Sequence, residues 1–443
     1  MRLTIEKLIY GGDGLARLTT ADQRRARAVL VPFVLPGEEV KANPVEEKPG
    51  FVRAALETIL VPSSERIAPL CPYFQRCGGC HYQHTGYDQQ LVIKREILRE
   101  TLQRTAKIRW EGEIPLHSSA PWNYRNRTRL KIGTAPFALG YYRYGSHDLL
   151  PVENCPISSP LINRAISALW EIGRDGIFNS YPIAEIEFFV DHDDTRLMLE
   201  LYATTPKSER EWEVVVGKLR AKMPMVASVA IFSRRPPPKK GRRRSDTGEP
   251  QLDACFSTEP FVYQTHEISY QVSPGSFFQT NRFLTERLLE LVCAEAHGTL
   301  ALDLYAGVGL FSAALARSFQ HVEAVEIAPA SFNDLRENVP RNVSVHQMTT
   351  AAYLTTAAGR KNPDLVVVDP PRAGLGEEVS RKLAAIGAAR LTYVSCDPAT
   401  LARDLNIFLR AGYDLQQLDL VDLFPETYHI ETVAQLVGTG RTR

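Results

Sequence analysis

The residue whose type and place most directly suggest covalent chemistry is Cys396. It follows the apolar run RLTYVS at 390–395 and precedes Asp397-Pro398, where a helix is predicted to begin. Only a few per cent of an ordinary thiol is ionised at pH 7, but the thiolate is a strong nucleophile, and the amides at a helix N-terminus stabilise it. The competing interpretation is a small buried hydrophobic residue, which is a frequent role for cysteine. We take Cys396 as a candidate nucleophile.

A glycine-rich turn followed by an acidic strand end indicates a nucleoside cofactor. A predicted strand ends in Asp303-Leu-Tyr305-Ala-Gly307-Val-Gly309, and glycines at this place let the backbone turn sharply close to a ligand. The next predicted strand ends at Glu326, whose carboxylate could accept hydrogen bonds from both ribose hydroxyls. The sequence lacks the third glycine of dinucleotide-binding turns and has no GxxxxGK(S/T) motif. S-adenosylmethionine, which has a ribose but no phosphate, therefore fits better than NAD or ATP.

A rigid acidic loop follows the fourth predicted strand of the same region. Asp369-Pro370-Pro371 places a carboxyl group at a strand end, before two prolines that fix the backbone and lack amide donors. Methyltransferases that act on the amino groups of adenine and cytosine carry a related loop with an aromatic residue after the prolines. Arg372 stands at that position here, which argues against an amino group as the methyl acceptor.

These residues, taken with Glu431, suggest one reaction. Uracil carbon 5 is too weak a nucleophile to take a methyl group directly, but addition of a thiolate to carbon 6 turns the ring into an enolate that is nucleophilic at carbon 5. After methyl transfer, a base removes the carbon-5 proton and elimination frees the enzyme. Glu431 opens a predicted last strand, and alone it would be read as a solvated carboxylate at a strand edge. Beside Cys396 and a methyl donor it is the candidate base.

Four of the seven cysteines have a spacing typical of metal ligands. Three lie in one short segment with five and then two residues between them, and the fourth follows 75 residues later. From spacing alone, structural zinc and a 4Fe–4S cluster are equally compatible with four thiolates. His81 and His84 lie close by in the sequence, and we expect them to be surface or hydrogen-bonded histidines rather than ligands. The four cysteines are Cys71, Cys77, Cys80 and Cys155.

The elements that must position these residues belong to an α/β region that starts near residue 299. Strands and helices alternate there, which predicts a parallel, doubly wound sheet with its ligand site at the carboxyl ends of the strands. Residues 1–60 are predicted to form short strands of a small β-barrel. A helix is predicted over 88–105 with Asp88 as its cap, and residues 120–270 are predicted to be mostly β with one helix near 158–173. The five predicted strands of the α/β region are TLALDLYAG, HVEAVEI, NVSVHQM, DLVVVDPP and RLTYVSC.

Length, charge and hydropathy exclude several classes of protein. The chain has 443 residues, of which 44% are hydrophobic and 23% charged, so it is expected to be globular with two to four domains. It has neither an apolar run near the ~18–20 residues of a membrane span nor a signal peptide, so we expect a cytoplasmic protein without a membrane partner. Residues 1–270 carry a net charge of +5 and residues 271–443 a net charge of −4. A basic loop at 234–250 adds to this asymmetry, which fits a polyanion-binding part joined to a catalytic part.

The sequence resembles the RNA uracil carbon-5 methyltransferase family over nearly its whole length. The similarity is closest to the branch with an N-terminal TRAM barrel and an iron–sulfur cluster, the bacterial 23S rRNA enzymes. The matching motifs are GGDGLAR at 11–17, CPYFQRCGGCHYQH at 71–84, YRNRTRLKIG at 124–133, GYYRYGSHDLLPVENCPI at 140–157, SFFQTN at 276–281, DLYAGVGLF at 303–311, DPPRAG at 369–374, VSCDPATLARDL at 394–405 and HIETVAQL at 429–436.

The resemblance implies roles for particular residues. Cys396 would be the nucleophile and Glu431 the general base, while Gln279 would join the cofactor and target-base pocket. It also favours a 4Fe–4S cluster over zinc, with a structural or RNA-positioning role. The predicted cofactor-binding residues are Gln279, Tyr305, Gly307, Glu326 and Asp369, and the predicted cluster ligands are Cys71, Cys77, Cys80 and Cys155.

The resemblance further implies a division of the chain and an RNA substrate. We expect a TRAM β-barrel at 1–60, a central, mostly β iron–sulfur and RNA-binding domain at 61–272, and a Rossmann-like methyltransferase domain at 273–443. A helical segment at about 87–117 is expected to pack on the last of these. The expected substrate is a flipped-out uridine of 23S rRNA, with the T-loop of tRNA as the alternative and no obligate protein partner. A reading of another class is a non-catalytic RNA-binding module.

Overall fold

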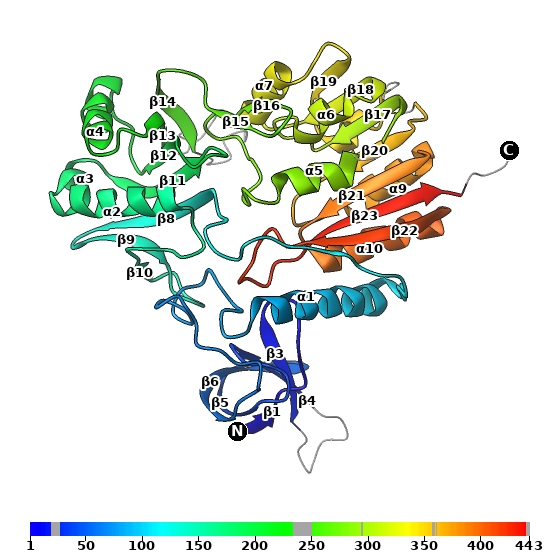
Figure 1. Ribbon diagram of the computed structural model, residues 1–443, viewed down its shortest axis with the longest axis horizontal. Helices are drawn as coiled ribbons and strands as arrows, with labels where there is room; N and C mark the ends of the chain where they lie inside the picture. Colours follow the sequence, from blue (N-terminus) through cyan, green and yellow to red (C-terminus); the bar gives the residue numbers. More distant parts are fainter. Residues whose placement is uncertain (19–26, 234–249, 294–295, 357–358, 360, 440–443) are drawn as a thin grey trace, which may run out of the picture. The chain divides into compact units, whose positions relative to one another are not determined.

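The computed structural model describes residues 1–18, 27–233, 250–293, 296–356, 359 and 361–439. Their contacts form two compact units, each built from separate stretches of the chain (Figure 1). Unit 1 comprises Met1–Pro121, Pro370–Ala384 and Tyr393–Arg443, and unit 2 comprises Trp122–Asp369 and Ala385–Thr392. The basic loop predicted at 234–250 lies, except for its last residue, outside the described residues. Among the described helices, none has both the length and the apolar content needed to cross a bilayer.

Unit 1 begins with a six-stranded sheet in the order β1-β5-β6-β4-β3-β2. Its strand pairs are antiparallel except for the parallel pair β4–β6. Alternate apolar residues such as Val29, Val31 and Val40 form its core, as the twofold period of a strand requires. The strands predicted within 1–60 are therefore present, and the closure of the sheet into a barrel stays a prediction. The strands are β1 (Arg2–Thr4), β2 (Lys7–Leu8), β3 (Asp13–Leu18), β4 (Arg27–Pro32), β5 (Glu39–Lys48) and β6 (Phe51–Val61).

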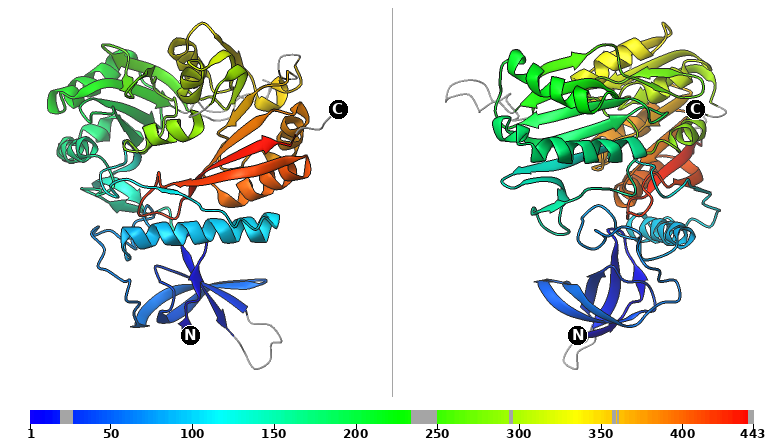
Figure 2. Two further views of the ribbon diagram at one scale, coloured as in Figure 1. Left: turned by 45° about the vertical axis from the view of Figure 1, so that its right-hand side comes forward. Right: turned by 60° about the vertical axis from the view of Figure 1, so that its left-hand side comes forward.

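A long helix follows this sheet in unit 1. The helix α1 (Tyr87–Thr101) continues into one π-helical turn, η1 (Leu102–Ala106), and runs beside the N-terminal sheet (Figure 2). It begins after Gly86 without a side-chain cap, so the predicted capping role of Asp88 is wrong. Asp88 lies in the first turn, where its negative charge interacts favourably with the positive end of the helix dipole. Helical structure also stops well before residue 117, because Lys107 turns into the left-handed region at φ 60°.

The C-terminal stretches of unit 1 place strands beside this helix. Strand β22 pairs antiparallel with β23 and parallel with β7, and α10 packs on β22. The Lys94 ammonium group in α1 lies 2.6 Å from the Asp422 carboxylate just after β22, and both side chains are fully buried. The elements are β7 (Leu116–His117), α9 (Gly376–Ile386), β21 (Arg390–Ser395), α10 (Pro398–Arg410), β22 (Tyr413–Val421) and β23 (Glu431–Gly438).

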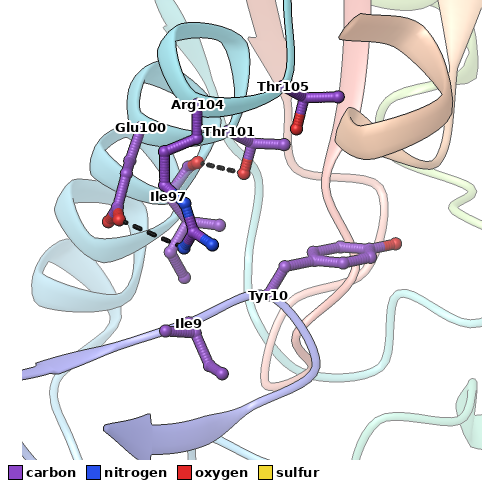
Figure 3. Close-up of a pocket in the computed structure, with 7 residues that line it drawn as sticks. All are labelled: Ile9, Tyr10, Ile97, Glu100, Thr101, Arg104 and Thr105. Carbon is purple, nitrogen blue, oxygen red and sulfur yellow. Dashed lines mark hydrogen bonds and ion pairs between the residues drawn. The ribbon is translucent and has the colours of Figure 1, made fainter. Parts of the chain in front are cut away.

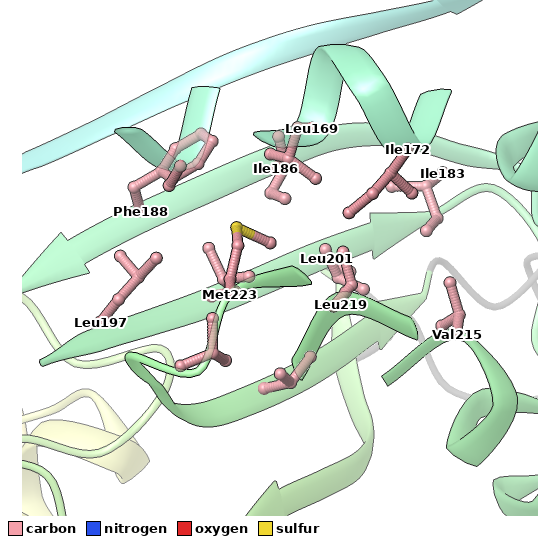
Figure 4. Close-up of a cluster of buried hydrophobic side chains, with 14 of the residues drawn as sticks. Leu169, Ile172, Ile183, Ile186, Phe188, Leu197, Leu201, Val215, Leu219 and Met223 are labelled. Carbon is pink, nitrogen blue, oxygen red and sulfur yellow. The ribbon is translucent and has the colours of Figure 1, made fainter. Parts of the chain in front are cut away.

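Unit 2 contains a seven-stranded sheet in the order β10-β9-β8-β11-β12-β13-β14. Its main core lies between the sheet and the helices α2 and α4, where Leu169, Leu201 and Leu219 pack together (Figure 4). The helix predicted near 158–173 is confirmed as α2. The elements are β8 (Arg127–Thr134), β9 (Phe137–Tyr142), β10 (Leu149–Pro151), α2 (Pro160–Arg174), α3 (Ile177–Ser180), β11 (Ile183–Val190), β12 (Leu197–Ala203), α4 (Glu209–Lys222), β13 (Val226–Ser233) and β14 (Gln251–Ser257).

The short helix α3 and the longer helix α4 correct the prediction of only one helix between 120 and 270.

The sequence carries clear signals for α4. This helix begins with a capping box, in which Ser208 accepts from the Glu211 amide and the Glu211 carboxylate accepts from Ser208. Trp212, Val215 and Leu219 then recur at helical spacing and are fully buried. Both signals are present in the sequence.

The α/β part of unit 2 has four parallel strands in the order β19-β18-β17-β20. They coincide with four of the predicted buried strands, and β21 coincides with the fifth, so the expected α/β alternation is confirmed. A short antiparallel pair, β15–β16, precedes them. The elements are β15 (Val262–Gln264), β16 (Ser269–Gln271), α5 (Thr285–Cys293), β17 (Gly298–Leu304), α6 (Leu310–Leu315), β18 (Phe319–Glu326), α7 (Pro329–Asn338), β19 (Val343–Gln347), α8 (Thr350–Tyr353) and β20 (Leu365–Val368).

Candidate functional site

The turn after β17 has an unusual backbone. Tyr305, Gly307 and Gly309 have φ angles of 68°, 56° and 92°, all in the left-handed region. A tyrosine held there marks a constrained site, because L side chains avoid this region. At Gly309 an added Cβ would also lie 2.8 Å from a methyl carbon of Leu335, so only glycine fits. The predicted glycine-rich turn is thus a real one, with α6 beginning directly behind it.

Glu326, at the end of β18, is fixed against this turn. One carboxylate oxygen accepts a hydrogen bond from the Gly307 amide at 2.9 Å. The other accepts from the amides of Ile327 and Ala328, each at 2.7 Å. The oxygen that accepts from Gly307 keeps a lone pair, so the carboxylate can still accept a hydrogen bond from a hydroxyl group of a ligand. The structure therefore brings together two of the predicted cofactor residues, Gly307 and Glu326.

Two more predicted residues meet after β20. The Gln279 amide donates to the Asp369 carboxyl group over 3.5 Å. Burial raises the pKa of Asp369, and the nearby Asp303 carboxyl raises it further. Burial also raises the pKa of Asp303, although the Ser312 hydroxyl that donates to it acts in the opposite direction. Both carboxyl groups therefore keep a proton to higher pH than ordinary aspartic acids do.

The segment that carries Gln279 is held by two residues of the YRNRTRLKIG motif. Asn126 donates from its side chain to the Gln279 carbonyl oxygen at 3.1 Å, and the Asn126 amide donates to Thr280. Arg127 donates to the Ser276 carbonyl oxygen. Both residues lie in the YRNRTRLKIG motif, but the sequence does not reveal that this motif supports a loop about 150 residues away.

The donor set of this part of unit 2 fits an adenosyl cofactor. Glu326 offers fixed carboxylate oxygens for ribose hydroxyls, and the turn at Tyr305–Gly309 lets a ligand approach the backbone. Asp369 and Gln279 offer a neutral or ionised carboxyl group and an amide at the adjoining strand end. When bound, S-adenosylmethionine would supply an electrophilic methyl group.

Cys396 lies in unit 1, directly after β21 and before α10. Asp397 caps α10, since its carboxylate accepts from the amides of Ala399 and Thr400 at 2.9 Å each. Ser395 closes the turn from the other side through hydrogen bonds with Asp397. The Cys396 carbonyl oxygen accepts a hydrogen bond from the Tyr10 hydroxyl at 3.2 Å. The half-buried thiol thus sits at a strand end followed by a capped helix, as the sequence predicts.

Glu431 is the first residue of β23 and is only 5% exposed. The segment before it, Asp422–Ile430, is tied to α1 and to the cysteine segment. Gln90 pairs with both the amide and the carboxylate of Glu426, and the Glu426 carbonyl accepts from the amides of His81 and Tyr82 at 2.8 and 3.0 Å. The reading of Glu431 as a solvated edge carboxylate is therefore wrong, because packing encloses it.

The cysteines are divided between the two units. Cys71, Cys77 and Cys80 lie in unit 1 and Cys155 in unit 2, all four half-buried, and none of the seven cysteines forms a disulfide. The Gln83 side chain accepts from the Cys71 amide at 3.1 Å, and the Asn163 side chain accepts from the Cys155 amide at 2.9 Å. Within the described part of the chain, no three cysteine, histidine or acidic side chains are grouped as metal ligands would be.

The two histidines beside the cysteine segment are buried. His81 is 9% and His84 1% exposed, and His84 hydrogen-bonds the Val34 carbonyl oxygen at 3.3 Å. Burial lowers the pKa of each to about 4, so both are neutral at physiological pH. The sequence predicts that His81 and His84 are either surface or hydrogen-bonded histidines. The hydrogen-bonded role is confirmed for His84, and neither His81 nor His84 lies on the surface.

The family profile and the similar proteins described below are all named as RNA methyltransferases. A profile of the family described as tRNA (Uracil-5-)-methyltransferase matches residues 86–437. An uncharacterized RNA methyltransferase from Aquifex aeolicus is 34% identical over 455 residues, which cover 98% of both chains. Another from Thermotoga maritima is 29% identical over 462 residues, which cover 99% of both chains.

Among solved structures, a full-length match is the tRNA (uracil-54, C5)-methyltransferase of Pyrococcus abyssi in complex with S-adenosyl-L-homocysteine. It has a TM-score of 0.73 and 25% sequence identity, and the match covers 99% of this chain and 100% of that one. The likeness extends over both compact units, so the N-terminal sheet and the central strands are part of the shared architecture as well as the α/β region.

Proposed function

Because the chain belongs to the tRNA (uracil-5-)-methyltransferase family, and is thus an RNA methyltransferase that acts on carbon 5 of uracil, we propose that it works through a transient bond between Cys396 and uracil carbon 6. The observation that carries this proposal is the position of Cys396 at a strand end, with a capped helix behind it and its backbone held by Tyr10. In the proposed reaction the sulfur–carbon bond forms first, and carbon 5 then takes the methyl group of S-adenosylmethionine.

The other residues would complete the reaction. Glu431 would remove the proton from carbon 5, and the electron pair of that bond would re-form the carbon 5–carbon 6 double bond and expel the Cys396 thiolate. Glu326 and Gly307 would hold the cofactor ribose, with Tyr305 at the same turn. Gln279 and Asp369 would line the place where the cofactor and the target base meet. A carboxyl group that keeps its proton there could donate to a base oxygen or nitrogen.

Two substitutions test these roles. Cys396→Ala should abolish methylation even in a single turnover, whereas a non-catalytic RNA-binding module would be indifferent to it. Glu431→Gln should accumulate a covalent RNA–protein adduct, because the methyl group can be transferred but the proton cannot be removed. The adduct is detected as a band of reduced mobility on denaturing electrophoresis. Full activity of Cys396→Ser, or no adduct with Glu431→Gln, would contradict the assignment.

We propose 23S rRNA as the substrate, with residues 1–60 and 61–272 serving RNA binding and 273–443 methyl transfer. The motifs shared with the rRNA branch support this choice. The T-loop uridine of tRNA is the alternative, and the names of the matching family and of the Pyrococcus abyssi enzyme favour it. Mapping 5-methyluridine in rRNA and tRNA from a deletion strain decides between them, because only the true substrate loses its modification.

We also propose that Cys71, Cys77, Cys80 and Cys155 hold a 4Fe–4S cluster, with zinc as the alternative. Four reduced thiols are a suitable donor set for either, and the reaction above uses none of them. Protein purified without oxygen should contain iron, inorganic sulfide and a broad visible absorption band. Cys77→Ser should lose all three, whereas Cys255→Ser, at an exposed cysteine in β14, should keep them. Zinc without sulfide would favour the alternative.

A further inference from the structure

Tyr10, in the turn between β2 and β3, reaches from the N-terminal sheet to the candidate nucleophile. Its hydroxyl donates to the Cys396 carbonyl oxygen at 3.2 Å, across 386 positions of sequence. Burial and the nearby Asp397 carboxylate raise the pKa of Tyr10, so the hydroxyl keeps its proton and can act as a donor. The contact is polar and directed at the backbone of the residue that would perform the chemistry.

The turn that carries Tyr10 also packs against the segment before Glu431. The Tyr10 ring meets the Tyr428 ring edge-on, with centroids 5.6 Å apart, and Tyr428 in turn meets His81 at 4.6 Å. Gly12 has a φ of +91°, and an added Cβ there would lie 3.1 Å from the His81 ring. The turn is therefore closely fitted between the cysteine segment and the segment that leads to Glu431.

The Tyr10 ring also lines a cavity beside the helix α1. This cavity has a volume of about 210 Å³, and residues of α1 and η1 such as Ile97, Glu100 and Arg104 line it. Figure 3 shows the Tyr10 hydroxyl directed away from Glu100 and Arg104. Because the ring lines this cavity, close packing does not surround it completely, so the contacts of its hydroxyl with Cys396 and Asp397 and the edge contact with Tyr428 contribute to its position.

We propose that Tyr10 is a positioning residue for Cys396, so that the N-terminal sheet takes part in catalysis as well as in any RNA contact. This inference rests on the proposed function of Cys396. By holding the Cys396 carbonyl, Tyr10 orients the backbone from which the thiol projects toward uracil carbon 6. Loss of one such hydrogen bond should slow formation of the covalent bond by about 3- to 10-fold. The affinity for RNA should not change when the Tyr10 hydroxyl is removed, since the proposed role of Tyr10 involves the Cys396 backbone and no contact with RNA.

The test compares rates of adduct formation in the Glu431→Gln background, where the adduct accumulates. Adding Tyr10→Phe removes one oxygen and keeps the ring against Tyr428, and should give the 3- to 10-fold slower rate with unchanged RNA Kd. The matched control adds Tyr181→Phe, which removes a tyrosine hydroxyl in unit 2 beside Trp212 and should leave the rate unchanged. An equal rate with and without Tyr10→Phe would overturn the proposal.

A second measurement does not depend on the reaction. Hydrogen–deuterium exchange of the backbone amides of residues 396, 397, 399 and 400 should be faster in Tyr10→Phe than in the wild type, without RNA or cofactor present. Unchanged exchange there would overturn the proposal, and a general rise in exchange across unit 1 would do the same, since it would indicate a purely structural role. If Glu431→Gln alone forms no adduct, the proposed function fails, and this exchange measurement still decides whether Tyr10 holds the Cys396 backbone.

Discussion

Replacing Glu426 with glutamine should change the way in which the stability of the protein depends on pH. Glu426 is only 2% exposed, and the Gln90 side chain holds it at two points. Gln90 donates to the Glu426 carboxylate at 3.0 Å and accepts from the Glu426 amide at 3.1 Å. Burial raises the pKa of Glu426 from 4.5 to about 7, although the bond from Gln90 and the charge of Lys94 act in the opposite direction.

The sign of the effect follows from linkage. A carboxyl group whose pKa is higher in the folded than in the unfolded chain contributes stability below its unfolded pKa and loses that contribution as pH rises through its folded pKa. The rise of the Glu426 pKa from 4.5 to about 7 corresponds to a contribution of about 3 kcal/mol to the free energy of unfolding, and this contribution is lost between pH 4.5 and 7. Glutamine cannot ionise but can still accept from Gln90. Glu426→Gln should therefore be as stable as the wild type near pH 4.5 and more stable by up to about 3 kcal/mol at pH 8.

Urea unfolding followed by circular dichroism, at several values between pH 4.5 and pH 8, measures this difference. The matched control is Glu96→Gln, because Glu96 is an exposed glutamate of α1, the helix whose Gln90 binds Glu426. The control should follow the wild type at every pH. If the free energies of unfolding of the wild type and Glu426→Gln run parallel over this range, the buried carboxyl group does not have the raised pKa, and the reasoning is refuted.

Three further predictions concern stability. Lys94→Met should lower the free energy of unfolding by about 3–5 kcal/mol because it leaves Asp422 buried without its cation, and Lys94→Met/Asp422→Leu should recover most of that loss in urea unfolding. A double variant no more stable than the single one would contradict this. Leu201→Ala, in the fully buried core of unit 2, should lower the thermal midpoint through a loss of about 2–5 kcal/mol. Gly309→Ala should lose at least about 1 kcal/mol and bind S-adenosylmethionine more weakly in calorimetry, because its φ of 92° is left-handed and Leu335 blocks the Cβ.

The sequence predicts those parts of the fold that depend on local patterns. Buried apolar runs locate β17–β21, and the cofactor turn follows from its glycines. The helix α4 lies in a stretch whose overall pattern predicts strands, although its capping box and its apolar spacing are visible in the sequence. Residue type alone suggests Asp88 as the cap of α1, whereas the helix starts two residues too early for that role, with Gly86 at the cap position.

The long-range contacts that hold the candidate site residues could not be predicted from local sequence patterns. The Tyr10–Cys396 contact and the Gln90–Glu426 pair join residues 386 and 336 positions apart, and no local pattern encodes such a pairing. Glu426, in the polar run PETYH, has the composition of an exposed loop, yet tertiary packing buries it. Residue type and resemblance thus indicate the candidate reacting groups, while the groups that hold them depend on the fold itself.

The long sequence separations between contacting residues of unit 1 affect how the protein folds while it is being synthesised. Lys94 and Asp422 are 328 positions apart, and β7 finds its partner β22 only near the end of the chain. Until the C-terminal part of the chain has been synthesised, Lys94 lacks Asp422, Tyr10 lacks the Cys396 carbonyl, and α1 lacks α10, against which it packs. Non-local contacts of this kind form late in folding. A nascent chain therefore lacks these contacts until β22 has been made, and loss of the residues from β22 onward would leave Lys94 and β7 without these partners.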